Sequence, residues 1–279
     1  MNIITLIENS REKKSLDNEW GLSLYVEANE RRILFDTGMS SAFVENAKKL
    51  DVDLSKVDMA VLSHGHFDHG GGLAAFFSAN GAAPLYLRTT ADDNLYGKFL
   101  VRKRYVGLDR ALLESNKTRL RWVEEDTEIA PGLHILTSIP DTERRPDTRS
   151  KILVKTEHGF VPDAFKHELV FVVKEEDGMS VITGCGHLGI LNMVLAAKRK
   201  FPGTPIKAVI GGFHTISNPI TDRMVATLLE MKAMAIRFKE LGCQRVISGH
   251  CTGRKASAIL RQELKESYSQ LNTGLTFEV

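Results

Sequence analysis

The sequence predicts an α/β protein, because three observations along the chain agree. First, short apolar runs rich in β-branched residues recur, and such runs are typical of buried strands. They lie at residues 57–62, 169–173, 179–183, 206–210 and 245–248. Second, stretches with helical periodicity separate several of these runs, as at residues 190–200. Third, glycine and histidine stand together after the strands, at His64, His187, His214 and His250. Residues beyond the carboxyl ends of strands in such sheets gather at one edge, where sites form.

The first part of the chain predicts strands and one helix ahead of a histidine-rich loop. Strands are expected at residues 2–8, 22–28 and 32–35, and the last two form a hairpin across Asn29-Glu30. The hairpin runs into Asp36, which either forms an Asx-turn or reaches a site. An amphipathic helix is expected at residues 41–50.

The histidine-rich loop follows the strand at residues 57–62 and reads His64-Gly65-His66-Phe67-Asp68-His69. In an extended segment His64 and His66 point the same way, and a turn through Phe67 returns Asp68 and His69 toward them. Imidazoles and a carboxylate suit zinc or a similar divalent ion, and four of them exceed the needs of one open site. We therefore expect two divalent metal ions, with Zn²⁺ favoured over Mn²⁺, Fe²⁺ or Mg²⁺. The alternative is a polar loop whose histidines cap the next helix.

Composition bounds the class of protein. The 279 residues, 43% of them hydrophobic, can bury a large core, and we expect a single domain over residues 1–279. A formal net charge of +2 gives no drive toward nucleic acid or anionic lipid. Three cysteines are too few for a disulfide scaffold and suit a reducing cytosol. No apolar run approaches membrane-spanning length. We expect a soluble cytoplasmic protein with a small-molecule substrate and no nucleic-acid or membrane partner.

The middle region, residues 89–150, has weak periodicity and predicts a loop-rich segment that shapes a substrate pocket. It carries two basic clusters, Arg102-Lys103-Arg104 and the run at residues 144–149. Solvated surface is the usual explanation of such clusters. Should they fold over the metals, they suit an anionic substrate, because guanidinium groups match phosphate or carboxylate oxygens.

The C-terminal half repeats the strand-to-helix arrangement. Gly184-Cys185-Gly186-His187-Leu188-Gly189 has the spacing of a dinucleotide site, but no acidic residue follows at the ribose position, so we reject a nicotinamide site. His214 and His250 each follow a later strand. A helix is predicted at residues 224–241, with Met224, Leu228, Met231 and Met234 expected in the core. His134 and His158 have no partners in the pattern.

Together these motifs resemble the metallo-β-lactamase superfamily. The segments concerned are Leu-Ser-His-Gly-His-Phe-Asp-His-Gly-Gly-Gly-Leu, Thr-Gly-Cys-Gly-His, Gly-Gly-Phe-His and Ser-Gly-His-Cys-Thr-Gly. They are similar to one branch, which contains uncharacterised metal-dependent hydrolases and archaeal 7,8-dihydropterin-6-methyl-4-(ribofuranosyl)aminobenzene-5′-phosphate synthases. The resemblance spans residues 19–253. It implies an αββα sandwich, in which two mixed β-sheets pack face to face with helices outside and metals at one edge.

The resemblance also implies roles for individual residues. The first metal would take His64, His66 and His187, and the second Asp68, His69 and His250. Asp36 would support the metal loop through hydrogen bonds. Many relatives have a bridging aspartate where this chain has Cys185, which is either a softer ligand or a small buried residue. Whether His167 is a metal ligand stays undecided, because the superfamily often has a ligand at a comparable position. His66 in place of glutamate argues against the oxygen-reducing di-iron branch.

The expected function is hydrolysis of an ester or phosphoester-type bond in a small anionic molecule by a metal-bound hydroxide. Asp68 would orient the hydroxide while it ligates. His214 would donate a proton or bind a substrate oxygen, unless it only packs at a helix start. The alternative is transfer of a dihydropterin methyl group with release of pyrophosphate, as the synthase resemblance implies. A non-catalytic metal-binding sensor ranks below both.

Overall fold

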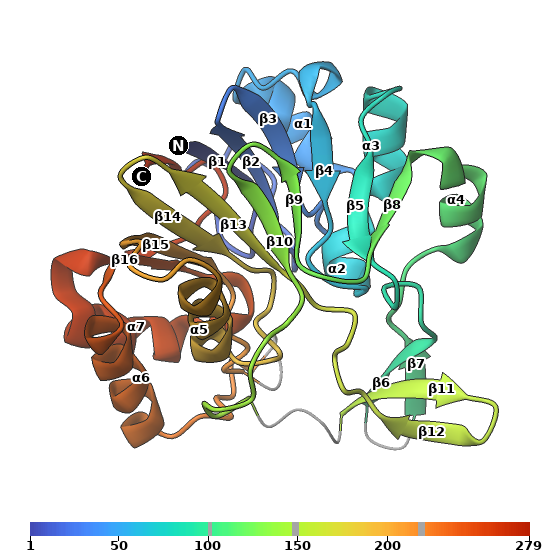
Figure 1. Ribbon diagram of the computed structural model, residues 1–279. Helices are drawn as coiled ribbons and strands as arrows, with labels where there is room; N and C mark the ends of the chain where they lie inside the picture. Colours follow the sequence, from blue (N-terminus) through green and yellow to red (C-terminus); the bar gives the residue numbers. More distant parts are fainter. Residues whose placement is uncertain (100–101, 147–150, 217–220) are drawn as a thin grey trace. The chain divides into compact units, whose positions relative to one another are not determined.

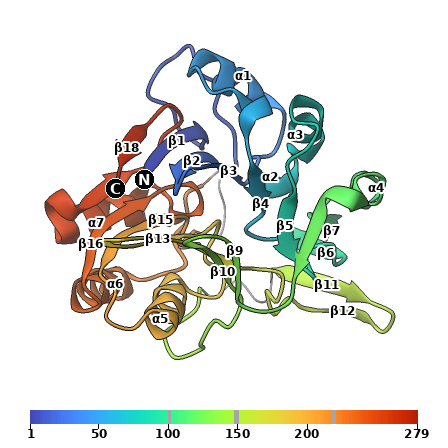
Figure 2. The same ribbon diagram turned by 45° about the horizontal axis from the view of Figure 1, so that its top comes forward.

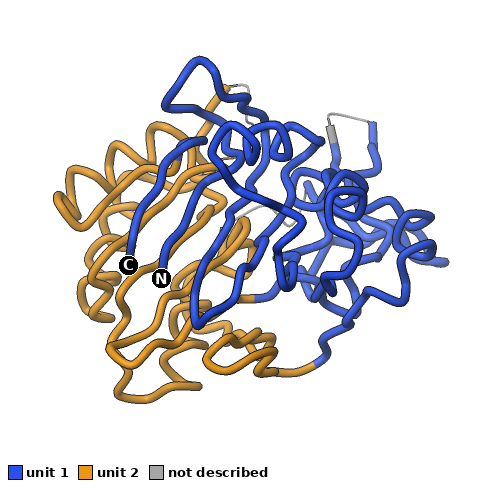
Figure 3. Tube along the Cα trace, turned by 90° about the horizontal axis from the view of Figure 1, so that it is seen from above, with its two compact units in different colours: residues 1–124, 148–169, 272–278 blue, residues 125–147, 170–271, 279 orange. Residues whose placement is uncertain are grey.

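The computed structural model describes residues 1–99, 102–146, 151–216 and 221–279. The chain forms two compact units (Figure 3). Unit 1 comprises residues 1–124, 148–169 and 272–278, and unit 2 comprises residues 125–147, 170–271 and 279. Each unit contains one seven-stranded mixed sheet. The predicted α/β class, with two mixed sheets flanked by helices, is confirmed. That the two units make one domain of residues 1–279 stays a prediction.

The main sheet of unit 1 has the strand order β18-β1-β2-β3-β4-β5-β8. Its strands are β1 (Asn2–Ile7), β2 (Ser23–Ala28), β3 (Arg31–Phe35), β4 (Met59–Val61), β5 (Leu85–Arg88), β8 (Leu120–Val123) and β18 (Thr276–Glu278). The predicted β2–β3 hairpin is present, and Asn29 and Glu30 have φ values of 49° and 60°. Positive φ at both turn residues matches the twist of the flanking strands. From β3 to β8 the strands are parallel.

The helices of unit 1 pack on this sheet through apolar side chains. They are α1 (Ala42–Lys49), α2 (Phe67–Gly70), α3 (Leu73–Ala79) and α4 (Arg110–Ser115), with short 3₁₀ turns η1 (Leu54–Lys56) and η2 (Lys117–Arg119). Phe43 of α1 and Phe76 of α3 are fully buried in one cluster with Leu34 and Leu85 of the sheet. Each such burial contributes about 1.5–3 kcal/mol, so the core fixes the position of β4 and the loop that follows it.

Unit 1 also contains a four-stranded sheet, which takes two of its strands from the region predicted to be loop-rich (Figure 1). Its order is β12-β11-β6-β7, with β6 (Leu95–Phe99), β7 (Arg102–Tyr105), β11 (Ile152–Thr156) and β12 (Gly159–Pro162). The ring of Tyr96 lies 5.6 Å from Tyr105 and 5.1 Å from Phe160. These strands occupy part of residues 89–150, and that the region shapes a substrate pocket stays a prediction. Cross-strand pairs between distant segments hold these short strands, and sequence periodicity does not show them.

The sheet of unit 2 has the order β17-β16-β15-β14-β13-β10-β9. Its strands are β9 (Thr127–Ala130), β10 (Leu133–Leu136), β13 (Val170–Glu175), β14 (Gly178–Ile182), β15 (Ile206–Gly211), β16 (Cys243–Ser248) and β17 (Tyr268–Gln270). Three helices cover one of its faces (Figures 1 and 2). They are α5 (Ile190–Lys200), α6 (Leu228–Glu240) and α7 (Arg254–Leu264), and the turns η3 (His250–Thr252) and η4 (Lys265–Ser267) flank α7. Because β14, β15 and β16 are parallel neighbours, their carboxyl ends lie side by side.

Helix α6 differs from its prediction. It begins at Leu228 rather than at residue 224, because Thr227 and Glu230 form a capping box that ends the preceding segment. Met231 is buried as expected, but Leu228 is 54% exposed, so the prediction of a core position there was wrong. The apolar residues of α6 are spread around the helix, and only one side meets the core. No helix within the described ranges is both long enough and apolar enough to cross a bilayer.

Candidate metal centre

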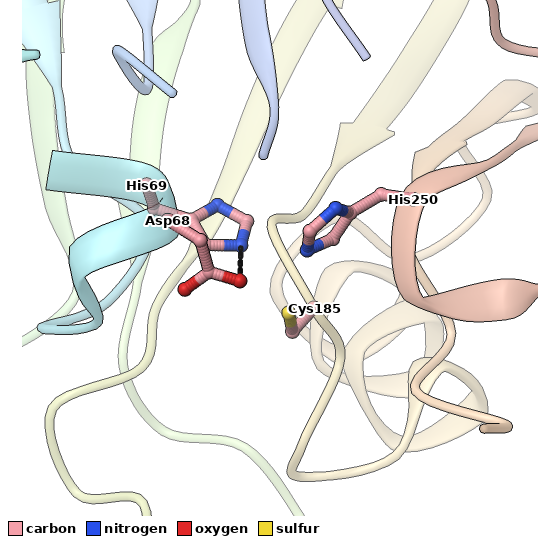
Figure 4. A group of neighbouring side chains, drawn as sticks. All are labelled: Asp68, His69, Cys185 and His250. Atoms are coloured by element: carbon pink, nitrogen blue, oxygen red, sulfur yellow. Dashed lines mark ion pairs between the residues drawn. The ribbon is translucent and has the colours of Figure 1, made fainter. Parts of the chain in front are cut away.

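The histidine-rich loop of unit 1 brings four ligand-type side chains together. The loop leaves β4, and α2 starts at Phe67 with His66 as its N-cap residue. The ring centroid of His64 lies 4.6 Å from that of His66 and 4.2 Å from that of His69. A carboxylate oxygen of Asp68 lies 3.9 Å from Nε2 of His69 (Figure 4). All four side chains are buried, as a preformed metal site requires.

Asp36 holds this loop from the end of β3. Its carboxylate accepts hydrogen bonds from the backbone N–H of Ser63 at 2.7 Å and from Ser63 Oγ at 2.7 Å. Its Oδ2 also lies 2.6 Å from Nδ1 of His69. Asp36 has a φ of 59°, a left-handed conformation that aspartate adopts more readily than most residues. These bonds tie the loop to the sheet.

The Nδ1 atoms of two loop histidines contact neighbouring oxygens. His69 Nδ1 meets Asp36, and His64 Nδ1 lies 2.8 Å from Ser63 Oγ. A carboxylate or other oxygen on one ring nitrogen orients the opposite nitrogen toward a metal in many metal sites. Burial, followed by the charge of His167, lowers the pKa of His66 to about 3. At neutral pH its imidazole is therefore in the neutral form that binds metals.

His167, whose role the sequence did not decide, supports the metal loop through a hydrogen bond to its backbone. Its Nδ1 accepts the backbone N–H of Gly65 at 3.2 Å, and its Nε2 lies 2.9 Å from Oδ2 of Asp163. The donor atoms of His66, Asp163 and His167 lie within 4.8 Å of one another. Because both ring nitrogens of His167 already have partners, we assign it to positioning. Asp163 was not predicted, and its signal is a carboxylate four residues before a histidine.

In unit 2, the loops after β14, β15 and β16 interlock through hydrogen bonds. Gly212 donates its N–H to the carbonyl of Gly184 at 2.8 Å. His214 donates its N–H to Sγ of Cys251 at 3.2 Å, and Phe213 donates its N–H to Oγ1 of Thr252 at 3.0 Å. The loop after β15 is therefore bonded to both neighbouring loops.

This edge of unit 2 carries the other predicted site residues. Cys185 follows β14 and His250 follows β16, and both are buried (Figure 4). The rings of His187 and His214 lie 4.2 Å apart. His214 and His250 have φ values of 45° and 50°. Positive φ at non-glycine residues is costly and clusters at functional sites.

Cys251 is a further candidate ligand at this edge of unit 2, and the sequence did not single it out. Donor atoms of Cys185, His214 and Cys251 lie within 4.8 Å of one another. Burial raises the pKa of the Cys251 thiol, but hydrogen bonds with Cys185 and His214 and the charge of His250 outweigh it, so the pKa lies well below its usual value. Its sequence signal was its position directly after His250 in a glycine-flanked turn.

Comparisons with known proteins agree on one family. The sequence profile of the metallo-beta-lactamase superfamily matches residues 21–187. A protein of Methanocaldococcus jannaschii named 7,8-dihydropterin-6-methyl-4-(beta-D-ribofuranosyl)-aminobenzene-5′-phosphate synthase is 32% identical over 273 residues, covering 92% of this chain and 89% of that protein. The crystal structure of Tm1679, a metal-dependent hydrolase of the beta-lactamase superfamily, has a TM-score of 0.83 and 30% identity and covers 100% of this chain and 99% of that one. Zn²⁺-bound PqqB from Methylobacterium extorquens, at 12% identity and a TM-score of 0.63 over 100% of both chains, shares the fold.

Proposed function

Because the chain belongs to the metallo-β-lactamase superfamily, we propose that it is a metal-dependent hydrolase of an ester or phosphoester-type bond in a small molecule. The observation that carries this proposal is the buried cluster of His64, His66, Asp68 and His69 on one loop, tied to the sheet by Asp36. Three imidazoles and a carboxylate buried together are rare in a packed core, whereas they are common ligands of a metal centre.

The donor set fits two divalent metal ions. We assign His64, His66 and His187 to the first and Asp68, His69 and His250 to the second, as the motifs imply, with Cys185 as a softer donor to either. The contact between Asp36 and His69 supports this fit, because metal-binding imidazoles commonly donate to a carboxylate. Bound metals supply Lewis acidity and lower the pKa of water from 15.7 to about 7, which makes hydroxide available at neutral pH.

Two side chains have catalytic roles in this scheme: one orients the attacking water, and the other donates a proton to the leaving group. Asp68 orients the attacking water, since its carboxylate accepts a hydrogen bond while it ligates. His214 donates a proton to the leaving oxygen. Its ring is half-buried, and its Nδ1 has no hydrogen-bond partner among the residues that the structure describes. An imidazole of this kind can hold a proton at one nitrogen and pass it on.

We further propose that the substrate carries a negative charge. In unit 1, Arg102, Lys103 and Arg104 are exposed along β7, which leads through Val106 to a hydrogen bond with the N–H of Phe67 in the metal loop. Cations on a strand joined to the loop raise the local concentration of an anionic molecule. Arg144 and Arg145 belong to unit 2, and residues 147–149 of that cluster lie outside the described residues.

A second candidate function is transfer of a dihydropterin methyl group with release of pyrophosphate. The observation that favours it is the 32% identity, over 92% of this chain, to the protein named as the synthase. Both reactions need divalent metals and a site that accepts anions, so only their products distinguish them. Hydrolysis consumes water and yields an acid and an alcohol, whereas transfer joins two organic molecules.

The test is metal content of protein purified without added metal, followed by assays of phosphodiesters, phosphomonoesters and lactones. We expect two equivalents of metal and turnover that His66→Ala abolishes. His158→Ala is the matched control, because that side chain is 88% exposed on the β11–β12 turn. Bound metal without hydrolysis of any ester would favour the transferase, and less than one equivalent would overturn the ligand assignment.

A further inference from the structure

Unit 2 contains a cavity of about 270 Å³ next to His214. One face of α6 forms a wall of it through Glu230, Ala233, Met234 and Arg237. These residues are spaced at i, i+3, i+4 and i+7, which places them on one side of the helix. The start of α5, the loop at residues 143–146 and residues 213–215 also line the cavity, which opens to solvent.

The interior of the cavity is mainly apolar. Ile190, Phe213, Val225 and Met234 contribute side chains to it. A binding pocket of this kind holds the apolar body of a ligand, and a few polar groups at its border fix the orientation. His214 is the titratable side chain of the pocket that the proposed mechanism uses.

The three arginines that line the cavity already face carboxylates. Arg144 forms an ion pair with Glu230, Arg145 Nε lies 2.6 Å from Asp141, and Arg237 Nε lies 2.8 Å from Glu143. Glu143 and Glu230 are themselves lining residues. The three guanidinium groups and the three carboxylates that face them sum to no net charge, so the charges favour a neutral ligand. The expectation that Arg144 and Arg145 bind an anion therefore finds no support in this pocket.

The loop wall is fixed before any ligand binds. Asn192 of α5 is fully buried and accepts the backbone N–H groups of Thr142 and Glu143 at 3.1 and 2.7 Å. Its amide group donates to the carbonyls of Glu143 and Leu188 at 2.9 and 2.8 Å. A preformed wall lowers the ordering cost of binding and favours a rigid ligand.

The volume of the cavity limits the size of the ligand that it can bind. A cavity of about 150 Å³ lined by apolar side chains binds benzene, and this one is just under twice that volume. We propose that the cavity binds a neutral, rigid, two-ring group of the substrate and so places the bond to be cleaved beside His214. The proposal deepens the proposed function and rests on it for the cleavage step only.

The test uses neutral alcohols, which have no bond to hydrolyse. We expect calorimetric titration of the full chain at pH 7 to show one site for 2-naphthol, at least tenfold tighter than for phenol or the anion 2-naphthoate. Ala233→Phe fills the cavity from α6 and should weaken 2-naphthol binding at least tenfold. Ile236→Phe is the matched control, because Ile236 is 54% exposed on another side of the same helix. Thermal unfolding checks that both variants fold.

Three results would overturn the proposal: no binding of 2-naphthol, equal binding to Ala233→Phe, or naphthoate binding as tightly as naphthol. None depends on metal or turnover, so failure of the hydrolase proposal would leave them readable. Where esters are hydrolysed, Ala233→Phe should lower kcat/KM for 2-naphthyl acetate, whereas the control Ile236→Phe should leave it unchanged.

Discussion

Replacing Asp36 by asparagine tests the support of the metal loop. The carboxylate accepts three short hydrogen bonds, from Ser63 N and Oγ at 2.7 Å each and from His69 Nδ1 at 2.6 Å. Asparagine keeps the shape, and it tolerates the φ of 59°. The change therefore removes the charge with little backbone cost, whereas Asp36→Ala would add about 1–2 kcal/mol of strain.

The magnitude follows from the bonds. A hydrogen bond to a charged group contributes about 1.5–3 kcal/mol and a neutral one about 0.5–1.5 kcal/mol, so three weakened bonds cost about 3–4.5 kcal/mol of unfolding free energy. The new amide N–H would also face His69 Nδ1 and force the imidazole proton onto Nε2. Because Nε2 then cannot ligate, metal affinity should fall about 10–100-fold, the usual effect of losing such a partner.

Urea denaturation of metal-free protein measures the first effect, and Zn²⁺ competition with a chromophoric chelator measures the second. Asp58→Asn is the control, because this carboxylate is exposed and accepts the backbone N–H of Arg32 at 2.8 Å, away from the metal loop. Wild-type zinc affinity in Asp36→Asn would refute the claim that Asp36 sets the state of His69.

Three further predictions concern the loop, a buried thiol and the cavity wall. Gly65→Ala should lower the free energy of unfolding by about 1–3 kcal/mol and disrupt metal binding, because its Cβ would lie 2.2 Å from the carbonyl oxygen of Ala91. Gly81→Ala is the control, because its Cβ would have no atom within 4 Å. Equal urea midpoints for the two variants would contradict this prediction. Burial raises the pKa of the Cys243 thiol to about 12. Above pH 9 the unfolded chain loses a proton from Cys243 that the folded chain keeps, so this thiol lowers stability by up to about 1.4 kcal/mol per pH unit. Between pH 8 and pH 10 the urea midpoint should therefore fall more steeply in wild type than in Cys243→Ala, and equal slopes would contradict this. Asn192→Ala removes four hydrogen bonds of the cavity wall and should cost about 2–4 kcal/mol; calorimetry with 2-naphthol should show weaker binding, and unchanged affinity would contradict the preformed wall.

Much of the fold could be predicted because its signals are local. The β2–β3 hairpin follows from Asn29 and Glu30, which adopt positive φ, and the strands from apolar runs of the right length. The metal loop was equally readable, because His64, His66, Asp68 and His69 lie within six residues after a buried strand. Where neighbours in sequence are neighbours in space, spacing alone identifies the chemistry.

Other features depend on contacts that close long loops of the chain. Gly65 meets His167 across 102 residues, and Asp163 orients His167 in turn. The β6–β11 pairing and the approach of Cys251 to Cys185 have no local pattern either. The neutral character of the cavity is a further example, because the sequence shows the basic run but not the carboxylates that face it.

The sequence by itself thus determined the fold class, the family and the candidate metal loop, since periodicity, turn residues and ligand spacing are local properties. Only the tertiary structure decided that both ring nitrogens of His167 have hydrogen-bond partners, that Cys251 lies beside Cys185 and His214 in unit 2, and that a neutral cavity lies beside His214. The physical reason is that hydrogen-bond partners and charge neutralisation are set by which distant segments meet, and folding alone brings them together.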